Sequence, residues 1–515
     1  MLVLRVARKY AGLFSGWRGL SALLLSAVLA AVPLAARADV VVGTKFSIAS
    51  GWAGVAAAYD GTNFLVALES DTQAANVAAQ LVSPSGTKIG AAIALGHGGQ
   101  SCCAAGVAFD GNNYLVAWEE DQGIKNSPAP FLVYGQFISA SGASVGQAFA
   151  MTSAGIWFDG MNMLAYGGGK YLLTYTRLIV PANGDNSNNR YVAGRIVSPD
   201  GTLGNEFRVS EGFGNGSSVA FDGTNFFVVW KEDAQDYEVR GRFVSPAGVL
   251  GQEISINASP ALSDNPVAAA FDGTNYMVVW TDRNSAASEA DVLGQRVSPD
   301  GALVGGAITI ASDPGVQMAM SVAFDGNNYL AVWTDMKNDA NGNGVCDAAE
   351  GSCWDVYGQY LGKDGALVGA KFAINTDAGN QIGGVGCAAG RCLALVSSGI
   401  AFGQGGPSQV GEVFGSFLTF QGASLPLNLV SGWNLLGYSG SAPIDLSQFN
   451  DTANVKTVWK WIASKSAWAF YAPSLNAADL ATYAAGKGYD VLTDINPGEG
   501  FWVNAARAFT INLPR

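Results

Sequence analysis

Alternating oxygen-bearing side chains mark one segment of this 515-residue sequence as a candidate cation site. From Asp339 the first half of the segment carries Asp or Asn at every second place, and two more carboxylates follow, the last being Glu350. A coiled loop points alternate residues inward, and a hard cation takes six to eight oxygen ligands. The three carboxylates would repel one another without a cation between them. The alternative interpretation is a solvated Asn-Gly-Asp loop.

The same segment resembles the twelve-residue calcium loop of EF-hand and dockerin proteins at every defining position. The resemblance implies Ca2+ in a structural role, with the ligands Asp339, Asn341, Asn343, Val345 through its carbonyl, Asp347 and Glu350. Gly344 stands where such loops turn sharply. The flanking helices of an EF-hand are not evident, because Trp333 lies in a strand pattern just before the loop. Cys346 occupies position eight, and we expect it to bond with Cys353.

The N-terminus has the features of a secretory signal peptide. Basic residues precede an apolar stretch from about Leu20 to Ala31, and small residues then occupy the two positions that a signal peptidase reads. The stretch is shorter than the ~20 residues that span a bilayer. We expect cleavage after Ala38, no transmembrane segment in the mature chain, and a secreted, periplasmic or cell-surface location. A membrane anchor is the alternative.

An oxidising compartment favours disulfides among the six cysteines. They form three local couples: Cys102 with Cys103, Cys346 with Cys353, and Cys387 with Cys392. Cys387 and Cys392 flank a predicted hairpin turn, so we expect them to bond across two strands. Whether the adjacent Cys102 and Cys103 bond to each other stays open. His97 is the only histidine, which leaves little for zinc or Ser-His-Asp chemistry.

Composition narrows the classes of protein to which the chain can belong. Hydrophobic residues make up 49% and charged residues only 13%, and there are 67 glycines. This mixture excludes a disordered acidic chain and a coiled coil, and it favours strands joined by tight turns. The formal charge is −13, and it becomes −18 once residues 1–38 are left out. We therefore expect no nucleic-acid partner.

One pattern recurs seven times at intervals of 50 to 63 residues. In its full form an aromatic residue, Asp-Gly, two polar residues and a second aromatic residue precede a Val/Leu-rich stretch that ends in Trp. The copies begin at Tyr59, Phe109, Tyr166, Phe221, Phe271, Phe324 and Cys387. Alternating hydrophobicity and turn residues divide each copy into four antiparallel strands, which is the pattern of a β-propeller blade.

The two ends of the repeat region predict ring closure. The last copy ends near Gly422 without a fourth strand, whereas residues 43–48 read as a fourth strand before the first copy. We expect an all-β fold in which residues 39–422 form a seven-bladed β-propeller, its N-terminal strand closing the last blade. This overlap resembles that of WD-repeat propellers, although the WD dipeptide is absent. An open solenoid is the alternative.

A smaller module follows the repeats, at residues 425–515, and holds five of the thirteen tryptophans. It loosely resembles small β-rich modules that end many secreted bacterial proteins, which implies no settled activity. Exposed tryptophans would stack on sugar rings, and the candidates are Trp433, Trp459, Trp461 and Trp502. We favour the alternative that the tryptophans form the core of this small domain.

These features favour an exported, non-enzymatic binding or scaffold protein whose ligand is an extracellular protein or glycan. Acids that follow the second strand, such as Glu232 and Asp282, recur at equivalent places in several copies, as scaffold residues do. A polysaccharide-active propeller hydrolase or lyase is one alternative, and a coupled acid pair or an arginine cluster at the centre of the ring would favour it. A structural surface or matrix component is the other. The ligand and the oligomeric state stay open.

Overall fold

The computed structural model divides the chain into two compact units, which we call the ring unit (38–422) and the C-terminal module (423–515). It describes residues 39–69, 77–95, 100–121, 131–157, 163–178, 190–232, 238–257, 267–283, 290–336, 354–377, 381–388, 391–398, 401–403, 406–409, 411–421, 425–438, 443–496 and 498–513. These residues form an all-β fold with a single α-helix among them, which lies in the C-terminal module.

Four sheets of the ring unit each consist of four consecutive antiparallel strands. The first comprises β3 (Ala53–Tyr59), β4 (Phe64–Glu69), β5 (Val77–Val82) and β6 (Lys88–Ala94). The second comprises β16 (Gly214–Phe221), β17 (Phe226–Glu232), β18 (Val239–Val244) and β19 (Leu250–Asn257). The third comprises β20 (Ala268–Phe271), β21 (Tyr276–Arg283), β22 (Ala290–Val297) and β23 (Leu303–Ala311). The fourth comprises β24 (Gln317–Phe324), β25 (Tyr329–Asp335), β26 (Asp355–Leu361) and β27 (Leu367–Asn375). Second strands such as β4 are buried on both faces, whereas fourth strands such as β6 are exposed edges.

A nine-stranded sheet contains two further sets of four. One set comprises β7 (Gln100–Phe109), β8 (Asn113–Asp121), β9 (Phe131–Ser139) and β10 (Ser144–Ala150). The other set comprises β12 (Leu164–Gly167), β13 (Lys170–Leu178), β14 (Arg190–Val197) and β15 (Leu203–Arg208). The short strand β11 (Ile156–Trp157) pairs with both β9 and β13 and so joins the two sets into one sheet.

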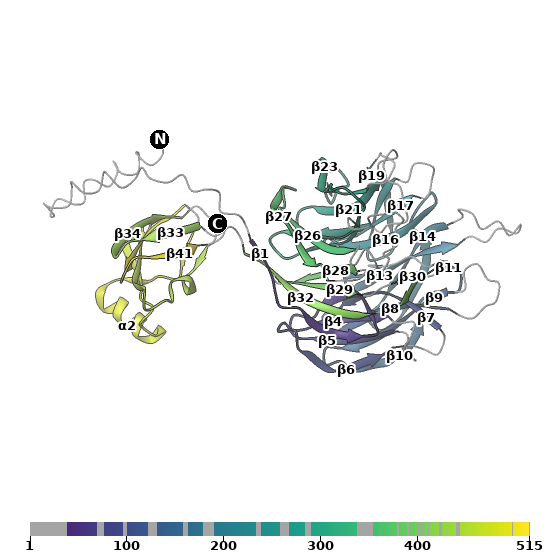
Figure 1. Ribbon diagram of the computed structural model, residues 1–515, viewed down its shortest axis with the longest axis horizontal. Helices are drawn as coiled ribbons and strands as arrows, with labels where there is room; N and C mark the ends of the chain where they lie inside the picture. Colours follow the sequence, from purple (N-terminus) through teal and green to yellow (C-terminus); the bar gives the residue numbers. More distant parts are fainter. Residues whose placement is uncertain are drawn as a thin grey trace, which may run out of the picture. The chain divides into compact units, whose positions relative to one another are not determined.

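The last sheet of the ring unit combines the two ends of this unit. It comprises β28 (Gln381–Ala388), β29 (Arg391–Ser398) and β32 (Glu412–Gln421), with β1 (Asp39–Val42) and β2 (Phe46–Ser50) both paired to β32. Figure 1 shows the purple β1 beside the green β32. The prediction that an N-terminal strand completes the last sheet is therefore confirmed. A hairpin that the repeats did not predict, β30 (Ala401–Gly403) and β31 (Gly406–Gln409), lies between β29 and β32 in the sequence.

Contacts between first strands run around the ring unit and return to their start. In order, β3 contacts β7, and the contacts continue through β12, β16, β20, β24 and β28, which contacts β3 again. One apolar cluster spans this junction, because it contains Phe64 and Val66 of the first sheet with Leu393 and Val413 of the last. The sheets therefore have a propeller-like arrangement in which the last sheet packs against the first.

The recurring Asp-Gly turns explain why the repeats fold as hairpins. In each turn one Asp carboxylate oxygen accepts hydrogen bonds of 2.6 to 2.8 Å from the backbone amides two and three residues later. The residues concerned are Asp60, Asp110, Asp222, Asp272 and Asp325. The glycine that follows has a positive φ, as Gly61 does at 97°. These aspartates cap the hairpin turns of the repeats.

The C-terminal module has three small sheets and one helix. A five-stranded sheet has the order β34 (Gly432–Gly437), β40 (Gly500–Ala505), β36 (Val455–Ile462), β37 (Ala467–Tyr471), β38 (Asp490–Val491). The pairs β33 (Leu425–Leu429) with β41 (Phe509–Leu513) and β35 (Ile444–Asp445) with β39 (Asp494–Ile495) complete the strands, and η1 (Leu446–Phe449) is a 3-10 turn. The helix α2 (Ala477–Lys487) begins at the N-cap Asn476 and ends at Gly488, whose φ is 73°.

Candidate functional site

The five-stranded sheet of the C-terminal module has two chemically different faces. One face carries Phe501, Val503 and Val458 into the apolar core of the module, where all three are fully buried. Because side chains alternate along a strand, the residues between them point to the opposite face. That opposite face, which we call the aromatic face, carries Trp433, Leu435, Trp459, Trp461, Trp468 and Trp502.

The strand register places these side chains in three rows across the sheet. The central row runs from Leu435 to Trp502 and Trp459, each directly opposite the next. A second row begins with Trp433 on the edge strand β34 and continues with Asn504 and Thr457. The third row pairs Trp461 with Trp468. Residues directly opposite each other have Cβ atoms roughly 5 Å apart, so the side chains within a row are neighbours.

Helix α2 covers only one end of the aromatic face. Its Leu480 packs in a small cluster with Phe470 and Ala472, and the half-buried Trp459 leans against this cluster. The ring of Trp459 lies 4.6 Å from that of Phe470, and its indole N–H donates to the Thr457 hydroxyl at 3.0 Å. The end of the aromatic face on β34 lies away from this cluster, at the opposite edge of the sheet.

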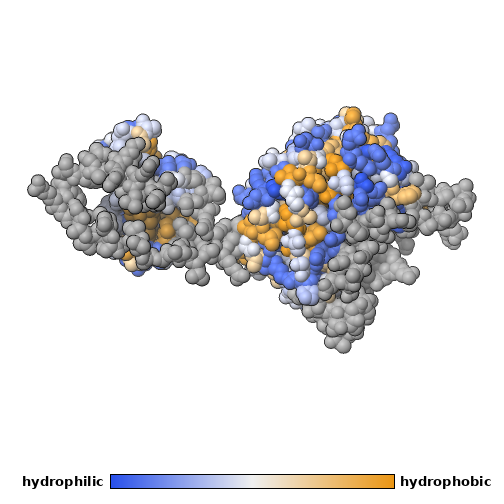
Figure 2. All heavy atoms as spheres, turned by 90° about the horizontal axis from the view of Figure 1, so that it is seen from above, coloured by the Kyte–Doolittle hydropathy of each residue, from blue (hydrophilic) through white to orange (hydrophobic). Residues whose placement is uncertain are grey.

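Tryptophans and a leucine are exposed at the uncovered end of the aromatic face. The exposed fraction is 56% for Trp433, 41% for Trp461 and 63% for Leu435. Among the described residues, the core cluster of the module contains no tryptophan. Our preference for tryptophans as core residues is therefore wrong for Trp433 and Trp461, because both lie on the strand face opposite the core. Figure 2 shows further apolar side chains, in orange, on the surfaces of both units.

A buried lysine fixes the loop that leads into β40. On the core side of β36, the Lys460 ammonium donates to the backbone oxygen of Asp494 and to the Glu499 carboxylate, both at 2.8 Å. The hydrogen bond from Thr493, together with that from Lys460, holds the pKa of the Asp494 carboxyl below its usual value. These contacts hold β40, and with it Trp502, in register between its neighbours.

The innermost strands of the ring unit carry no charged side chain. Within their described bounds, β3, β7, β12, β16, β20, β24 and β28 contain no Asp, Glu, Lys, Arg or His. Small residues dominate there, and a Cβ added to Gly386 would lie 2.9 Å from the Ala57 carbonyl oxygen of the neighbouring sheet. The described centre of the ring thus offers neither an arginine cluster nor an acid pair.

One charged cluster of the ring unit, in the set β12–β15, is largely buried, with side-chain exposures of 10% for Arg177 and 24% for Glu206. The Arg177 guanidinium binds the Glu206 carboxylate and donates to the Ala154 carbonyl at 2.8 Å. The Tyr175 hydroxyl, fully buried, donates to the same carboxylate at 2.6 Å. Burial alone would raise the pKa of Glu206, but the bonds from Arg177 and Tyr175 outweigh it and lower that pKa. A tyrosine without exposed surface has no access to substrate, so this cluster has the features of a structural ion pair.

Acids at the ends of the second strands differ in their surroundings. Arg240 binds both Glu232, at 2.8 Å, and Glu238, at 2.6 Å, in one sheet. In the next sheet Asp282 lies directly opposite Asp291, and burial together with the Asp291 charge raises the pKa of Asp282. Equivalent positions therefore do not share one chemical role.

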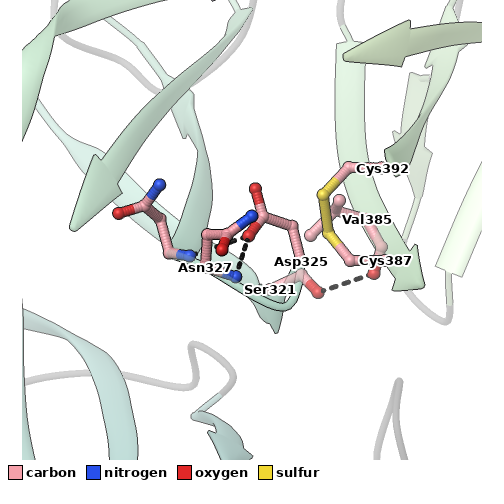
Figure 3. The surroundings of a disulfide bond; sticks show 7 residues. Ser321, Asp325, Asn327, Val385, Cys387 and Cys392 are labelled. Carbon is pink, nitrogen blue, oxygen red and sulfur yellow. Dashed lines mark hydrogen bonds between the residues drawn. A yellow bond between two sulfur atoms is a disulfide. The ribbon is translucent and has the colours of Figure 1, made fainter. Parts of the chain in front are cut away.

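The Cys387–Cys392 disulfide is present, as the sequence predicted. It joins β28 to β29 at the place where other sheets have an aromatic pair such as Phe324 and Tyr329. Figure 3 shows it near Ser321, whose hydroxyl lies 3.5 Å from the Val385 carbonyl oxygen of the neighbouring sheet. A disulfide is compatible with an exported protein.

The other predicted sites fall outside the part of the chain that the structure describes. This applies to the calcium ligands Asp339, Asn341, Asn343, Val345, Asp347 and Glu350, to Cys346 and Cys353, and to the side chains of Cys102 and Cys103. The described residues contain no group of three or more His, Cys, Asp or Glu side chains that would hold a metal ion. No helix among them is long and apolar enough to cross a membrane.

Comparisons with known proteins find similarity of structure only. No protein-family model and no curated protein matches the chain. An acylaminoacyl peptidase solved with a chloromethyl ketone is 8% identical over 76% of this chain, with a TM-score of 0.41, and the match spans 58% of that protein's length. The β-propeller domain of the Trilobed protease from Pyrococcus furiosus is 11% identical, covering 72% of this chain and 94% of that domain, with a TM-score of 0.39.

A neuraminidase-like protein of A/little yellow-shouldered bat is 10% identical, covering 74% of this chain and 100% of that one, with a TM-score of 0.36. All three solved structures are less than 12% identical to this chain, with TM-scores below 0.5. Their similarity to this chain is too low to assign an activity.

Proposed function

We propose that this protein is an exported, non-enzymatic binding protein that attaches to an extracellular glycan through the aromatic face of its C-terminal module. The observation that carries the proposal is the exposure of Trp433 and Trp461 on one flat sheet face, beside the half-buried Trp502. An exposed indole ring presents a flat apolar surface whose negative π face attracts the polarised C–H groups of a sugar ring.

Two features favour a glycan over a protein ligand. Asn504 and Thr457 lie in the same row as Trp433, so an amide and a hydroxyl adjoin the indoles where sugar hydroxyls would need partners. Leu435 is the single aliphatic residue among the six of the aromatic face. The hot spots of protein interfaces instead fill well-packed pockets.

The test is binding of the purified full chain to a panel of soluble and insoluble polysaccharides, followed by sedimentation assays and by tryptophan fluorescence. We expect at least one polysaccharide to bind and to change the indole emission. The double variant Trp433→Ala/Trp461→Ala should lose that binding and keep its thermal unfolding temperature. The matched control is Phe213→Ala, which removes an exposed aromatic ring of the ring unit. Binding that survives in the double variant would contradict the proposal.

We also infer that the ring unit is a seven-bladed β-propeller that serves as scaffold. The circular order of contacts among β3, β7, β12, β16, β20, β24 and β28 supports this count, with β2 as outer strand of the last blade. The charge-free inner strands support a scaffold over an enzyme with a central active site. The expected export, with cleavage after Ala38, is tested by sequencing the N-terminus of the mature protein.

A structural calcium ion bound by residues 339–350 belongs to this proposal. Pairing of β25 with β26 extends to Asp335 opposite Asp355, so the two ends of the loop that carries the ligand pattern lie side by side. Calorimetric titration of the chelator-treated protein with Ca2+ should show one weak site. Loss of that site in Asp339→Ala/Glu350→Ala would support the assignment, and unchanged binding in this variant would refute it.

A second candidate function, hydrolysis of polysaccharide, has one observation in its favour. Asp282 has a raised pKa and a neighbouring carboxylate, Asp291, and such a pair can divide the roles of general acid and base. Hydrolysis that Asp282→Asn abolishes, with folding unchanged, would establish the enzyme in place of the scaffold.

A further inference from the structure

The two exposed indoles of the aromatic face and the half-buried indole of Trp502 lie on a diagonal that crosses three adjacent strands. Trp433 is in the row of Asn504, Trp502 in the row of Leu435, and Trp461 in the row that faces Trp468. Each step moves by one strand, about 4.8 Å, and by two residues, about 6.8 Å, so successive Cα atoms are roughly 8 Å apart. The whole diagonal therefore spans roughly 16 Å.

We propose that this diagonal binds a neutral, extended oligosaccharide whose sugar rings stack in turn on Trp433, Trp502 and Trp461. The inference rests on the proposed glycan-binding function and adds the charge, the length and the path of the ligand. A ligand lying along the diagonal contacts three strands at once, whereas a monosaccharide covers a single indole. Affinity should therefore rise with chain length until the three indoles are covered.

Small residues keep the path of the ligand open at its Trp461 end. In the third row, the positions on β34 and β40 beside Trp461 are Gly437 and Gly500, which pair with each other. A Cβ added to Gly437 would meet no atom within 4 Å. The surface beside Trp461 on the β34 side is thus unobstructed, which leaves room for a chain that continues past the sheet edge.

The distribution of charge specifies an uncharged ligand. Residues 423–515 contain six Lys and Arg against six Asp and Glu, so the module has no net charge. The −18 of residues 39–515 therefore falls entirely on the ring unit. None of the six residues that define the aromatic face is an Arg or Lys that could bind the carboxylates or sulfates of an acidic polysaccharide. The exposed Lys456 lies beside Thr457 at the bulge of β36, away from the row of Trp461.

The experiment measures affinity along a length series of neutral oligosaccharides by calorimetry, with the full chain as titrand. The oligosaccharides come from the polysaccharide that binds in the panel assay, and a carboxylated oligosaccharide of matched length serves as the acidic probe. We expect affinity to increase over the shortest members and then level off, and the acidic probe to bind at least tenfold more weakly. Trp433→Ala and Trp461→Ala should each weaken binding of the longest member about tenfold.

The variants separate the path of the ligand from the glycan-binding function as such. Binding of monosaccharide should be little affected by Trp433→Ala, because it removes only one of the three stacking positions. Equal affinity for monosaccharide and long chains, or preference for the acidic probe, would overturn the diagonal while leaving glycan binding intact. Failure of every polysaccharide to bind would refute the proposed function itself. Phe213→Ala again serves as the control that should change no affinity.

Discussion

Single tyrosine hydroxyls connect neighbouring sheets of the ring unit. Tyr114 donates to the Asn63 carbonyl at 3.0 Å, and Tyr329 donates to the Asn275 carbonyl at 2.6 Å. In both pairs the acceptor is the last residue of the Asp-Gly turn of the preceding sheet. Burial, together with the nearby Asp272 carboxylate, raises the pKa of Tyr329, so the hydroxyl keeps its proton and remains a donor. The second aromatic residue of the repeat, where it is tyrosine, thus links neighbouring sheets by a hydrogen bond, a role that the sequence alone did not show.

Replacement of Tyr329 by phenylalanine tests this connection. The substitution keeps the ring but removes the hydrogen bond from the hydroxyl to the Asn275 carbonyl, which retains only its bond from the Asp272 amide at 3.0 Å. We therefore expect the free energy of unfolding to fall by about 0.5–1.5 kcal/mol. Chemical denaturation of the variant measures the change. Tyr483→Phe, at an exposed position of α2, is the control and should have no effect. An unchanged midpoint for Tyr329→Phe would show that the hydroxyl does not hold the sheets together.

The ion pair of Arg177 and Glu206 predicts a specific dependence on pH. The pKa of Glu206 is lowered in the folded protein, so the unfolded state binds a proton more readily. The pair therefore stabilises the fold fully above the usual pKa of 4.5, and this contribution is lost as the pH falls through the lowered value. Glu206→Gln should lower the melting temperature at pH 7, and the difference from the native protein should shrink below about pH 4. A difference that is constant with pH would contradict this assignment.

At the scale of elements, the turns and strands could be predicted from the sequence, whereas the solvent exposure of individual strand side chains could not. The Asp-Gly pattern located hairpins such as β16–β17, because turn chemistry is local. The helix α2 was missed, although Asn476, Asp479 and Gly488 provide both of its caps. The core role expected for Trp433 and Trp461 failed for a related reason. Which face of a strand is buried depends on distant elements, including the position of α2, and no local pattern encodes that.

Strand β2 is held in place by a close contact with the strand beside it. A Cβ added to Gly415 of β32 would lie 2.5 Å from the Phe46 ring, so only glycine permits this ring to cover the strand. Gly415→Ala should therefore displace Phe46 and destabilise the ring unit by about 1–3 kcal/mol. Gly306→Ala, where an added Cβ meets no atom within 4 Å, is the matched control. Denaturation midpoints of the two variants give the comparison, and equal midpoints would mean that this contact is unimportant.

For the whole molecule, the joining of the chain ends determines whether the ring unit is one cooperative structure. Ile48 of β2 is 2% exposed and packs with Phe64 of the first sheet and Leu393 of the last. Hydrogen bonds add to this joint, because Arg391 donates to the Pro84 carbonyl at 3.0 Å across 307 residues of sequence. Pairing of β1 and β2 covers the edge of β32, which would otherwise be free to pair with another chain.

Ile48→Ala should accordingly weaken the entire ring unit and leave the C-terminal module unaffected. Loss of the buried side chain should lower the free energy of unfolding by about 2–5 kcal/mol. Calorimetry should show the transition of the ring unit moving to lower temperature as a single peak, while that of the module stays in place. Val249→Ala, at a position 67% exposed, should move neither transition. If the ring transition instead splits in two, the sheets unfold in separate groups, and β2 stabilises its own sheet alone.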